Sequence, residues 1–346
     1  MKLQDLLKNV DVLEIKGDSD IEVSDIQTDS RKSKENSLFI AIKGVQVDGH
    51  QYIDSAIKLG TTVIIYEETI SSFKKGITYV KVPHSAEAAG IIATTWFGNP
   101  TAKLKLVGVT GTNGKTTTAT LMYDVFRKLG YKAGLLSTVA NYIDGEMLPA
   151  THTTPDPLTL NKLLADMVSV GCQYAFMEVS SHAIHQRRIS GLTFAGGIFT
   201  NLTQDHLDYH GTMEEYLKAK KKFFDDLPST AFALTNADDK NGMVMLQNTK
   251  ARKQTYSVKG LADFKARIIE KHFDGTAVEI NGKEVQLQFV GVFNVYNLLA
   301  VYAGCVLLGQ KPEEILLVLS TLKPVAGRFE TIRSPQGFTA IVDYAH

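Results

Sequence analysis

Short runs of apolar residues alternate with amphipathic stretches from about residue 102 onward. Consecutive apolar positions predict strands that are buried on both faces, and apolar positions three or four residues apart predict helices that cover them. The predicted strands are 104–110, 174–179, 194–200 and 231–235, and the predicted helices are 116–129, 157–170, 213–226 and 294–309. This alternation predicts a doubly wound α/β domain with a mostly parallel sheet, whose functional groups gather at the carboxyl ends of the strands.

The first 97 residues alternate in the same way, with strands predicted at 38–42 and 62–66 and a short helix at 52–59. A turn cluster follows at 97–101, Phe-Gly-Asn-Pro-Thr. We therefore expect an amino-terminal α/β domain over 1–97 and a central domain over 98–332.

Later in the chain, Gly275 and the pair Asn281-Gly282 are hairpin signals between short alternating strands, so 252–290 predicts a small antiparallel addition. A last apolar strand, 338–343, stands almost at the end of the chain with no helix after it. We therefore expect the chain to be incomplete.

Composition excludes some classes of function. The 346 residues carry 37 basic and 37 acidic side chains, so no net charge attracts nucleic acid or a membrane surface. Mean hydropathy is -0.05, no apolar run reaches the length of a membrane span, and the amino terminus has no signal-peptide core. We expect a soluble, cytoplasmic monomer whose two cysteines, Cys172 and Cys305, are reduced.

The first predicted strand of the central domain continues into a glycine-rich loop with the spacing of a phosphate-binding loop. Gly111 and Gly114 allow the backbone to curl with its N–H groups directed inward, and Lys115 can reach terminal phosphates. The Thr116 hydroxyl is placed to bind Mg²⁺, and the following helix directs its positive end at the same phosphates. The loop predicts a nucleoside triphosphate site.

Two other predicted strands end in polar clusters. Glu178, at the end of 174–179, can complete a Mg²⁺ site, or Glu178 and Ser180 can simply cap the next helix. The segment 200–210 holds two histidines and two acids within six residues, which favours a metal or phosphate role.

A lysine-rich helix follows that segment. Judged from the residues alone, the run that includes Lys220 is a solvated basic face with a pair between Glu214 and Lys218.

Together these segments resemble the Mur ligases of peptidoglycan synthesis. The matching motifs are Gly-Thr-Asn-Gly-Lys-Thr at 111–116, His-Thr-Thr-Pro-Asp at 152–156, Glu-Val-Ser-Ser-His-Ala at 178–183, Thr-Asn-Leu-Thr-Gln-Asp-His-Leu-Asp-Tyr-His-Gly at 200–211, Tyr-Leu-Lys-Ala-Lys at 216–220, Asn-Val-Tyr-Asn at 294–297 and Gly-Arg-Phe-Glu at 327–330. Thr-Asp-Ser-Arg at 28–31 and Asp-Gly-His at 48–50 resemble the branch that adds a diamino acid to UDP-N-acetylmuramoyl-L-alanyl-D-glutamate.

The resemblance implies ATP and two Mg²⁺ ions, with Lys220 carbamylated and therefore a carboxylate that orients the metal's water. The implied catalytic residues are Lys115, Lys220, His206 and Glu178, and the implied metal ligands are Thr116, Glu178, His206 and Lys220. The implied nucleotide contacts are Gly111, Thr112, Asn113, Gly114, Lys115, Thr116, Thr117, Asn294, Asn297, Arg328 and Asp343. The implied contacts to the UDP-sugar peptide are Thr28, Ser30, Val45, Gln46, Thr153, Thr154, Ser180, Gln186 and Arg188.

The resemblance further implies that ATP phosphorylates the side-chain carboxylate of D-glutamate and that an amine then attacks the acyl phosphate. The family has a third, Rossmann-like domain that binds the added amino acid. The resemblance implies that 333–346 is only the start of that domain, which is truncated in this chain. We therefore expect this chain to be inactive alone, with meso-diaminopimelate and L-lysine both possible.

Two other functions fit part of the pattern. A folylpolyglutamate or cyanophycin-type ligase shares the loop and the lysine position, but Thr-Asp-Ser-Arg at 28–31 argues against it. A non-catalytic nucleotide-binding module needs no second metal site, so Glu178, His206 and Lys220 together argue for chemistry.

Overall fold

The computed structural model describes residues 1–45, 47–150, 152–273, 275–333 and 339–343, which pack as two compact units. The first unit contains 1–103 together with 155–166 and 185–192, and the rest of the described chain forms the second. The two additional segments lie inside the predicted central domain, so packing does not follow the predicted boundary at residue 97. Our domain limits stay a proposal.

The first unit has a five-stranded sheet in the order β1-β5-β4-β3-β2, in which only β1 is antiparallel to its neighbour. The strands β3, β4 and most of β5 are buried, because their apolar residues face helices on both sides. Its elements are α1 (Leu3–Leu7), β1 (Glu14–Lys16), β2 (Asp25–Gln27), β3 (Ser37–Ile40), α2 (Ile53–Lys58), β4 (Val63–Tyr66), β5 (Thr78–Lys81) and α3 (Ser85–Trp96).

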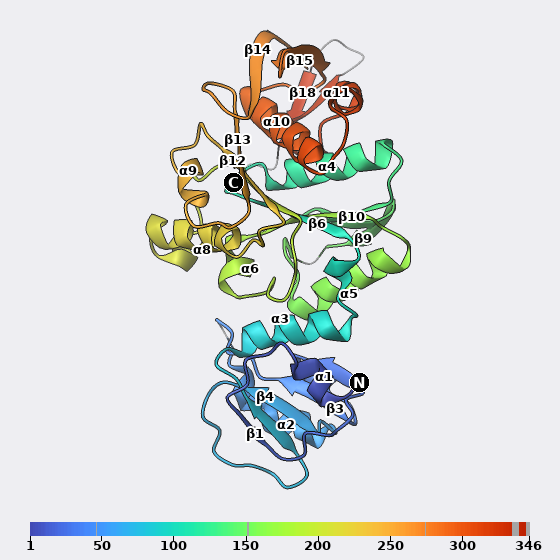
Figure 1. Ribbon diagram of the computed structural model, residues 1–346, viewed down its shortest axis with the longest axis vertical. Coiled ribbons are helices and arrows are strands. Elements are labelled where there is room, and N and C mark those ends of the chain that lie inside the picture. Colours follow the sequence, from blue (N-terminus) through green and yellow to red (C-terminus); the bar gives the residue numbers. More distant parts are fainter. Residues whose placement is uncertain (46, 151, 274, 334–338, 344–346) are drawn as a thin grey trace. The chain divides into compact units, whose positions relative to one another are not determined.

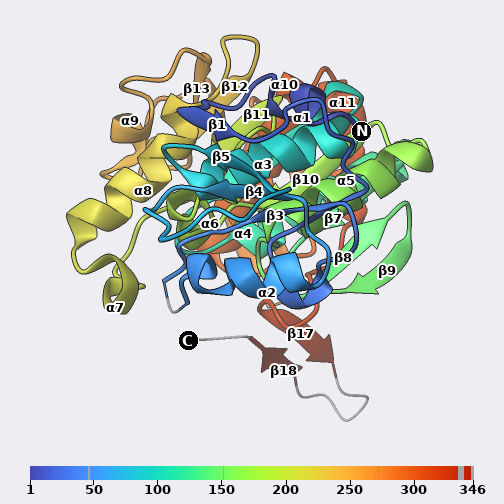
Figure 2. The ribbon, with the colours of Figure 1, turned by 90° about the horizontal axis from the view of Figure 1, so that it is seen from below.

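The second unit is built on an eleven-stranded sheet in the order β16-β15-β14-β13-β12-β11-β6-β10-β7-β8-β9. Its strands are β6 (Lys105–Thr110), β7 (Ala133–Leu136), β8 (Ala140–Ile143), β9 (Glu146–Pro149), β10 (Tyr174–Glu178), β11 (Gly196–Phe199), β12 (Phe232–Asn236), β13 (Arg252–Ser257), β14 (Phe264–His272), β15 (Gly275–Ile280) and β16 (Lys283–Leu287). The strands from β14 through β6 to β7 are parallel, and antiparallel pairs extend the sheet at both ends. Figure 2 shows the β8–β9 hairpin at one of these ends.

The central position of β6 determines where ligands can bind. Chain order reverses there, because β10 pairs with one side of β6 and β11 with the other. In open α/β sheets, the crevice at such a switch point lies at the carboxyl ends of the strands. The glycine-rich loop after Thr110 therefore lies where the topology favours a ligand.

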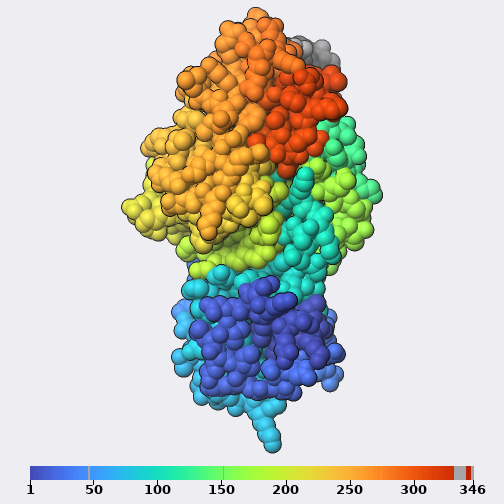
Figure 3. Space-filling model, viewed as in Figure 1, coloured from blue at the N-terminus to red at the C-terminus, as the bar shows by residue number. Residues whose placement is uncertain are grey.

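Helices cover both faces of this sheet. Figure 1 shows α4 (Lys115–Lys128) and α10 (Val292–Leu307) on one face and α8 (Met213–Asp225) on the other. The remaining α-helices of this unit are α6 (Ser181–His185), α7 (Leu207–His210), α9 (Gly242–Met245) and α11 (Pro312–Thr321), and a separate two-stranded sheet joins β17 (Glu330–Arg333) to β18 (Thr339–Val342). Most of α5 (Pro157–Ser169) belongs to the first unit. Figure 3 shows the 252–287 segment, in orange, beside α11, in red.

The predicted fold class is confirmed, and each predicted strand and helix of the central domain is present within one or two residues of its expected limits. The turn signals at Gly275 and Asn281-Gly282 are also confirmed, because the antiparallel pairs β14–β15 and β15–β16 turn at these positions. The prediction of an antiparallel addition over 252–290 is only partly right, because β13 pairs parallel with β12 and β14 pairs parallel with β13. The pattern did not predict α3, α11 or the β8–β9 hairpin.

Close packing of α8 on the sheet depends on a glycine in the middle of β6. A Cβ at Gly108 would lie 2.6 Å from Phe223 Cζ on α8 and 2.8 Å from Val179 Cγ2. Because both neighbours are in a packed interior, we predict that Gly108→Ala lowers the free energy of unfolding by about 1–3 kcal/mol. Urea titration monitored by circular dichroism would measure this.

The matched control is Gly260→Ala, whose Cβ would meet its nearest neighbour, Ser257 Oγ, at an ordinary 3.5 Å. If the free energies of unfolding of both variants lie within about 0.5 kcal/mol of the wild-type value, the assignment of Gly108 as a packing glycine is wrong.

Candidate functional site

The loop between β6 and α4 requires glycine at two positions. Gly111 and Gly114 have φ values of +150° and +86°, a region that L side chains rarely adopt. A side chain on Gly111 would collide with Thr200 Oγ1, and one on Gly114 with Asn297 Oδ1. The loop is therefore enclosed between the segment after β11 and the first turns of α10.

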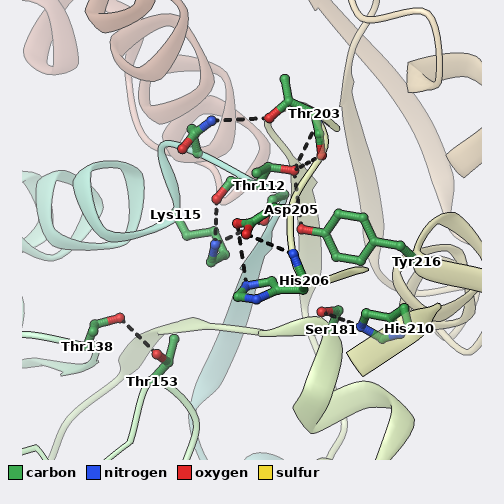
Figure 4. Close-up of polar contacts among 12 residues, drawn as sticks. Thr112, Lys115, Thr138, Thr153, Ser181, Thr203, Asp205, His206, His210 and Tyr216 are labelled. Carbon is green, nitrogen blue, oxygen red and sulfur yellow. Dashed lines mark hydrogen bonds and ion pairs between the residues drawn. The ribbon is translucent and has the colours of Figure 1, made fainter. Parts of the chain in front are cut away.

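Hydrogen bonds fasten this loop to the segment that follows β11. The backbone N–H of Asn113 donates to Asn201 Oδ1 at 3.0 Å, and Thr200 Oγ1 donates to the Asn113 carbonyl at 2.6 Å. The Thr112 hydroxyl lies 3.2 Å from both the Thr203 carbonyl and the Tyr216 hydroxyl. Figure 4 shows Thr112 between Thr203 and Tyr216. These bonds within the protein hold the loop in a defined conformation.

Two lysines converge on one carbonyl of the loop. The Lys115 ammonium donates to the carbonyl oxygens of Gly111 at 3.0 Å and Thr112 at 2.8 Å. The Lys220 ammonium, from α8, donates to the same Gly111 oxygen at 2.9 Å. Burial lowers the pKa of Lys115, while the charges of Glu178 and Asp205 oppose this. The charge of Lys115, with a second basic group beside it, makes this end of the sheet attractive to an anion.

Lys220 is almost fully buried, with 1% of its surface exposed. Burial and then the nearby Lys115 charge hold its pKa well below its usual value, and the ammonium lies 4.5 Å from the Tyr216 ring centroid. Judged from the residues alone, this side chain belonged to a solvated face, and that interpretation is wrong for Lys220. It holds for Lys218, which pairs with Glu214 at 2.9 Å on the exposed side of α8.

Glu178 lies at the end of β10, 1% exposed, and contacts three donors of the second unit. Thr116 Oγ1 donates to Glu178 Oε2 at 3.0 Å, and the backbone N–H and hydroxyl of Thr138 donate to Oε1 at 2.7 and 3.1 Å. Sequence reasoning did not predict Thr138, which comes shortly after β7. Its hydroxyl oxygen also lies 3.1 Å from Thr153 Oγ1, within hydrogen-bond distance, as Figure 4 shows.

The donor set around Glu178 fits Mg²⁺. Two oxygens at neighbouring corners of a Mg²⁺ octahedron with 2.0–2.1 Å bonds lie about 3 Å apart. Thr116 Oγ1 and Glu178 Oε2 lie 3.0 Å apart and are both hard oxygen donors. Within the described ranges, no group of three or more His, Cys, Asp or Glu residues is arranged to hold a metal. A cation here would therefore take hydroxyl, phosphate or water oxygens as further ligands.

Thr154 and Ser180 lie close to the backbone of Glu178. Thr154 Oγ1 donates to the Glu178 carbonyl at 2.9 Å, and the Ser180 N–H donates to Thr154 Oγ1 at 3.2 Å. Ser180 Oγ accepts from the Ala183 N–H at 3.2 Å, so the alternative interpretation as a helix cap applies to Ser180. Glu178 instead points toward the glycine-rich loop.

His206 directly precedes α7 as its N-cap and has a left-handed φ of 51°. Its Nε2 lies 3.5 Å from Asp205 Oδ2, and its ring packs edge-on against His182 at 4.9 Å between centroids. Asp205 also acts on both Lys115 and Lys220, because its charge raises the pKa of each. The histidine therefore belongs to the same electrostatic cluster as the lysines.

The predicted nucleotide contacts on α10 are buried. Asn294 and Asn297 are 2% and 7% exposed and are joined by a 3.4 Å hydrogen bond. Arg328 lies near enough to Lys115 for its charge to lower the lysine pKa. Asp343 accepts from the backbone N–H of Phe329 at 3.1 Å, and Thr117 is buried in the first turn of α4.

The predicted contacts to the uridine end lie in the first unit. Thr28 and Ser30 follow β2, and Val45 follows the neighbouring parallel strand β3, so they share one edge of the sheet. Val45 is 68% exposed in a turn closed by the Gly44 N–H and the Val47 carbonyl. Gln46 lies outside the described residues.

Gln186 and Arg188, predicted for the peptide end, also belong to the first unit. The Arg188 guanidinium donates to Gln186 Oε1 at 2.6 and 3.0 Å, which orients both side chains.

Comparison with known proteins supports what this geometry indicates. Residues 109–305 match the Mur ligase middle domain, and residues 22–97 match the model described as Mur ligase family, catalytic domain. The chain belongs to the Mur ligase family. This Mur ligase is 63% identical, over its whole length and 71% of the relative's length, to a UDP-N-acetylmuramoyl-L-alanyl-D-glutamate–2,6-diaminopimelate ligase of Parabacteroides distasonis. The protein of the same name from Bacteroides fragilis is 59% identical over the same share.

A solved structure agrees in fold. The structure of a UDP-N-acetylmuramoyl-L-alanyl-D-glutamate–2,6-diaminopimelate ligase matches all of this chain and 71% of its own, with a TM-score of 0.84 and 25% identity. Within the described part of this Mur ligase, none of the helices is long and apolar enough to cross a membrane.

The depressed pKa of Lys220 predicts a dependence of stability on pH. Between the lowered pKa of the folded state and the usual lysine value of 10.5, the unfolded chain binds a proton that the folded chain does not. Stability contributed by this site therefore rises with pH across that window. Relative to Lys220→Met, the free energy of unfolding of the wild type should increase by up to about 1.4 kcal/mol per pH unit.

Urea titrations in CO₂-free buffer without nucleotide would measure the slope. Lys222→Met is the control, because Lys222 is on the exposed face of α8 in a pair with Asp226. A difference between wild type and Lys220→Met that is constant or falls with rising pH would show that Lys220 is not desolvated.

Proposed function

We propose that this Mur ligase uses ATP to join the side-chain carboxylate of D-glutamate in UDP-N-acetylmuramoyl-L-alanyl-D-glutamate to an amino group of a diamino acid. The observation that supports this best is the convergence of Lys115, Lys220 and the Glu178–Thr116 pair around one glycine-rich loop. The names of the relatives favour 2,6-diaminopimelate over L-lysine as the amine.

The reaction needs activation because a carboxylate is a poor electrophile. Transfer of the terminal phosphoryl group of ATP to the D-glutamate carboxylate gives an acyl phosphate, which the amine attacks with release of phosphate. Lys115 would exchange its bonds with Gly111 and Thr112 for the transferring phosphoryl oxygens and neutralise their charge. Positioning and charge account for most of the catalysis in phosphoryl transfer.

Thr116 and Glu178 are the residues that would hold Mg²⁺, and Thr138 would keep the carboxylate of Glu178 oriented. When bound, Mg²⁺ supplies positive charge to the phosphate oxygens. His206, beside Asp205, is the proposed residue for a second Mg²⁺.

Lys220 is the proposed site of the family's lysine carbamate. A neutral amine attacks the carbon of CO₂, an N–C bond forms and the nitrogen loses a proton, which leaves a carbamate anion. The low pKa of Lys220 supports this step, because it favours the neutral amine that reacts. The product would place a carbamate anion beside Lys115 in place of the amine, and this anion can orient metal-bound water.

We assign the uridine end of the substrate to Thr28, Ser30, Val45 and Gln46 of the first unit. The residues proposed for the peptide end are Thr153, Thr154, Ser180, Gln186 and Arg188. Asn294, Asn297, Arg328 and Asp343 are proposed to complete the nucleotide site.

Ligand-dependent thermal unfolding tests this function against its alternatives. UDP-N-acetylmuramoyl-L-alanyl-D-glutamate at a hundred times its dissociation constant should stabilise the chain by about 2.7 kcal/mol, and folate should not. Stabilisation by folate alone would favour a folylpolyglutamate-type ligase. Stabilisation by Mg²⁺ and ADP without any effect of the UDP-sugar peptide would favour a nucleotide-binding module.

We predict that Lys115→Ala weakens the binding of ADP and leaves the binding of the UDP-sugar peptide unchanged. Loss of the ammonium that contacts the phosphates should weaken ADP binding roughly ten- to a hundredfold, the loss expected for a charged hydrogen bond. Affinity for the UDP-sugar peptide should not change, because its proposed uridine contacts lie in the first unit. Isothermal titration calorimetry measures both, with Lys222→Ala as a charge-matched control, and equal ADP affinity in wild type and Lys115→Ala would show that the phosphate loop is misassigned.

A further inference from the structure

A turn at the carboxyl end of β12, residues 236–239, has no role in the function proposed above. Its central residue, Asp238, accepts four hydrogen bonds from other segments: Ser257 Oγ at 2.7 Å, the Val258 N–H at 2.8 Å, the Lys259 N–H at 3.0 Å and the Tyr296 hydroxyl at 2.8 Å. Burial raises the pKa of Asp238, but these donors outweigh it and the pKa is lowered overall. The carboxylate is therefore an ionised anchor for several loops.

The bond from Tyr296 connects the turn to α10, which carries two of the proposed nucleotide contacts. Tyr296 is in the second turn of the helix, between Asn294 and Asn297. Asn297 Oδ1 lies so close to Gly114 that a side chain there would collide with it. The Tyr296–Asp238 bond therefore joins the turn to the helix whose first turns contact the glycine-rich loop.

Two other residues of the turn, Asn236 and Asp239, bond to the segment that follows β11, which packs against the glycine-rich loop from its other side. Asp239 Oδ2 accepts from the Leu202 N–H at 2.9 Å, and Asn236 Nδ2 donates to the Thr200 carbonyl at 2.9 Å. The segment so held, 200–203, makes the hydrogen bonds to Thr112 and Asn113 described above. The two segments that enclose the glycine-rich loop, α10 and 200–203, are thus both attached to this four-residue turn. We call these segments the α10 wall and the 200–203 wall.

We propose that the turn 236–239 positions the nucleotide site, with Asp238 and Tyr296 holding the α10 wall and Asp239 holding the 200–203 wall. The inference rests on the proposed function, because it assumes that the loop binds the phosphates of a nucleotide. These residues act through Asn297 and the loop and contact no reacting atom. Their removal changes the affinity for ADP and not the affinity for the UDP-sugar peptide.

The experiment uses Tyr296→Phe, which removes one hydroxyl and leaves the three other donors on Asp238. Its control is Tyr302→Phe on the same helix, whose ring packs against Phe264 at 6.2 Å between centroids. Calorimetric titrations with Mg²⁺ and ADP, and separately with the UDP-sugar peptide, are compared with thermal unfolding of the ligand-free chain. We expect ADP affinity to fall roughly three- to thirtyfold in Tyr296→Phe, the range of couplings through such networks.

A merely structural role would lower the ligand-free unfolding temperature or weaken both ligands alike. Tyr296→Phe with wild-type ADP affinity, or with equal losses for both ligands, overturns the inference while the proposed function stands. Wild-type chain that binds no ADP overturns the proposed function and the inference with it.

Asp239→Asn provides an independent second variant. Asp239 accepts from both the Leu202 and Asn241 N–H groups, and an amide offers only one oxygen for these two donors. We expect a similar selective loss of ADP affinity through the 200–203 wall. Unchanged ADP affinity in this variant would overturn the assignment of that wall to the turn.

Discussion

The second unit is organised around one carbonyl oxygen, that of Gly111, which accepts from the ammonium groups of both Lys115 and Lys220. Two cations on one acceptor would repel each other, and the charge of Lys115 is one reason why the pKa of Lys220 is low. An anion placed between the two nitrogens would favour the charged form of both. The carboxylates of Glu178 and Asp205 supply this effect only in part, since the pKa of Lys115 stays lowered by burial. This imbalance of charge is the physical reason to assign phosphates to the loop.

Bringing the second lysine to that oxygen requires α8 to lie very close to the sheet. Gly108 and Gly197, on neighbouring strands, leave the space that the Phe223 ring of α8 fills. Without side chains at these two positions, Lys220 can reach the end of β6 although its helix begins on the exposed side of the unit. Packing in the sheet interior and the electrostatics of the site are therefore consequences of the same glycines. A change in the core would alter the distance between the two lysines.

The sequence was sufficient for the fold class and for the glycine-rich loop because both are local signals. Apolar runs determine strands, and glycine spacing determines a backbone curl. The burial of Lys220 could not be predicted from its neighbours in the sequence, because it depends on glycines more than twenty residues away. Its importance came only from the resemblance to the Mur ligases. The attachment of 155–166 and 185–192 to the first unit was missed for the same reason, since nothing in their own pattern indicates which unit they contact.

Residues that orient others were the hardest to predict. Thr138 fixes Glu178 from 40 residues away, and Asp238 contacts Tyr296 from 58 residues away. A threonine in a turn or an aspartate after a strand is ordinary in sequence, because such residues commonly satisfy their own backbone. In this Mur ligase they instead join segments that carry the proposed ligand contacts. The precision of the site thus depends on polar groups whose partners only the folded chain reveals, and their substitution should change ligand affinity before it changes the fold.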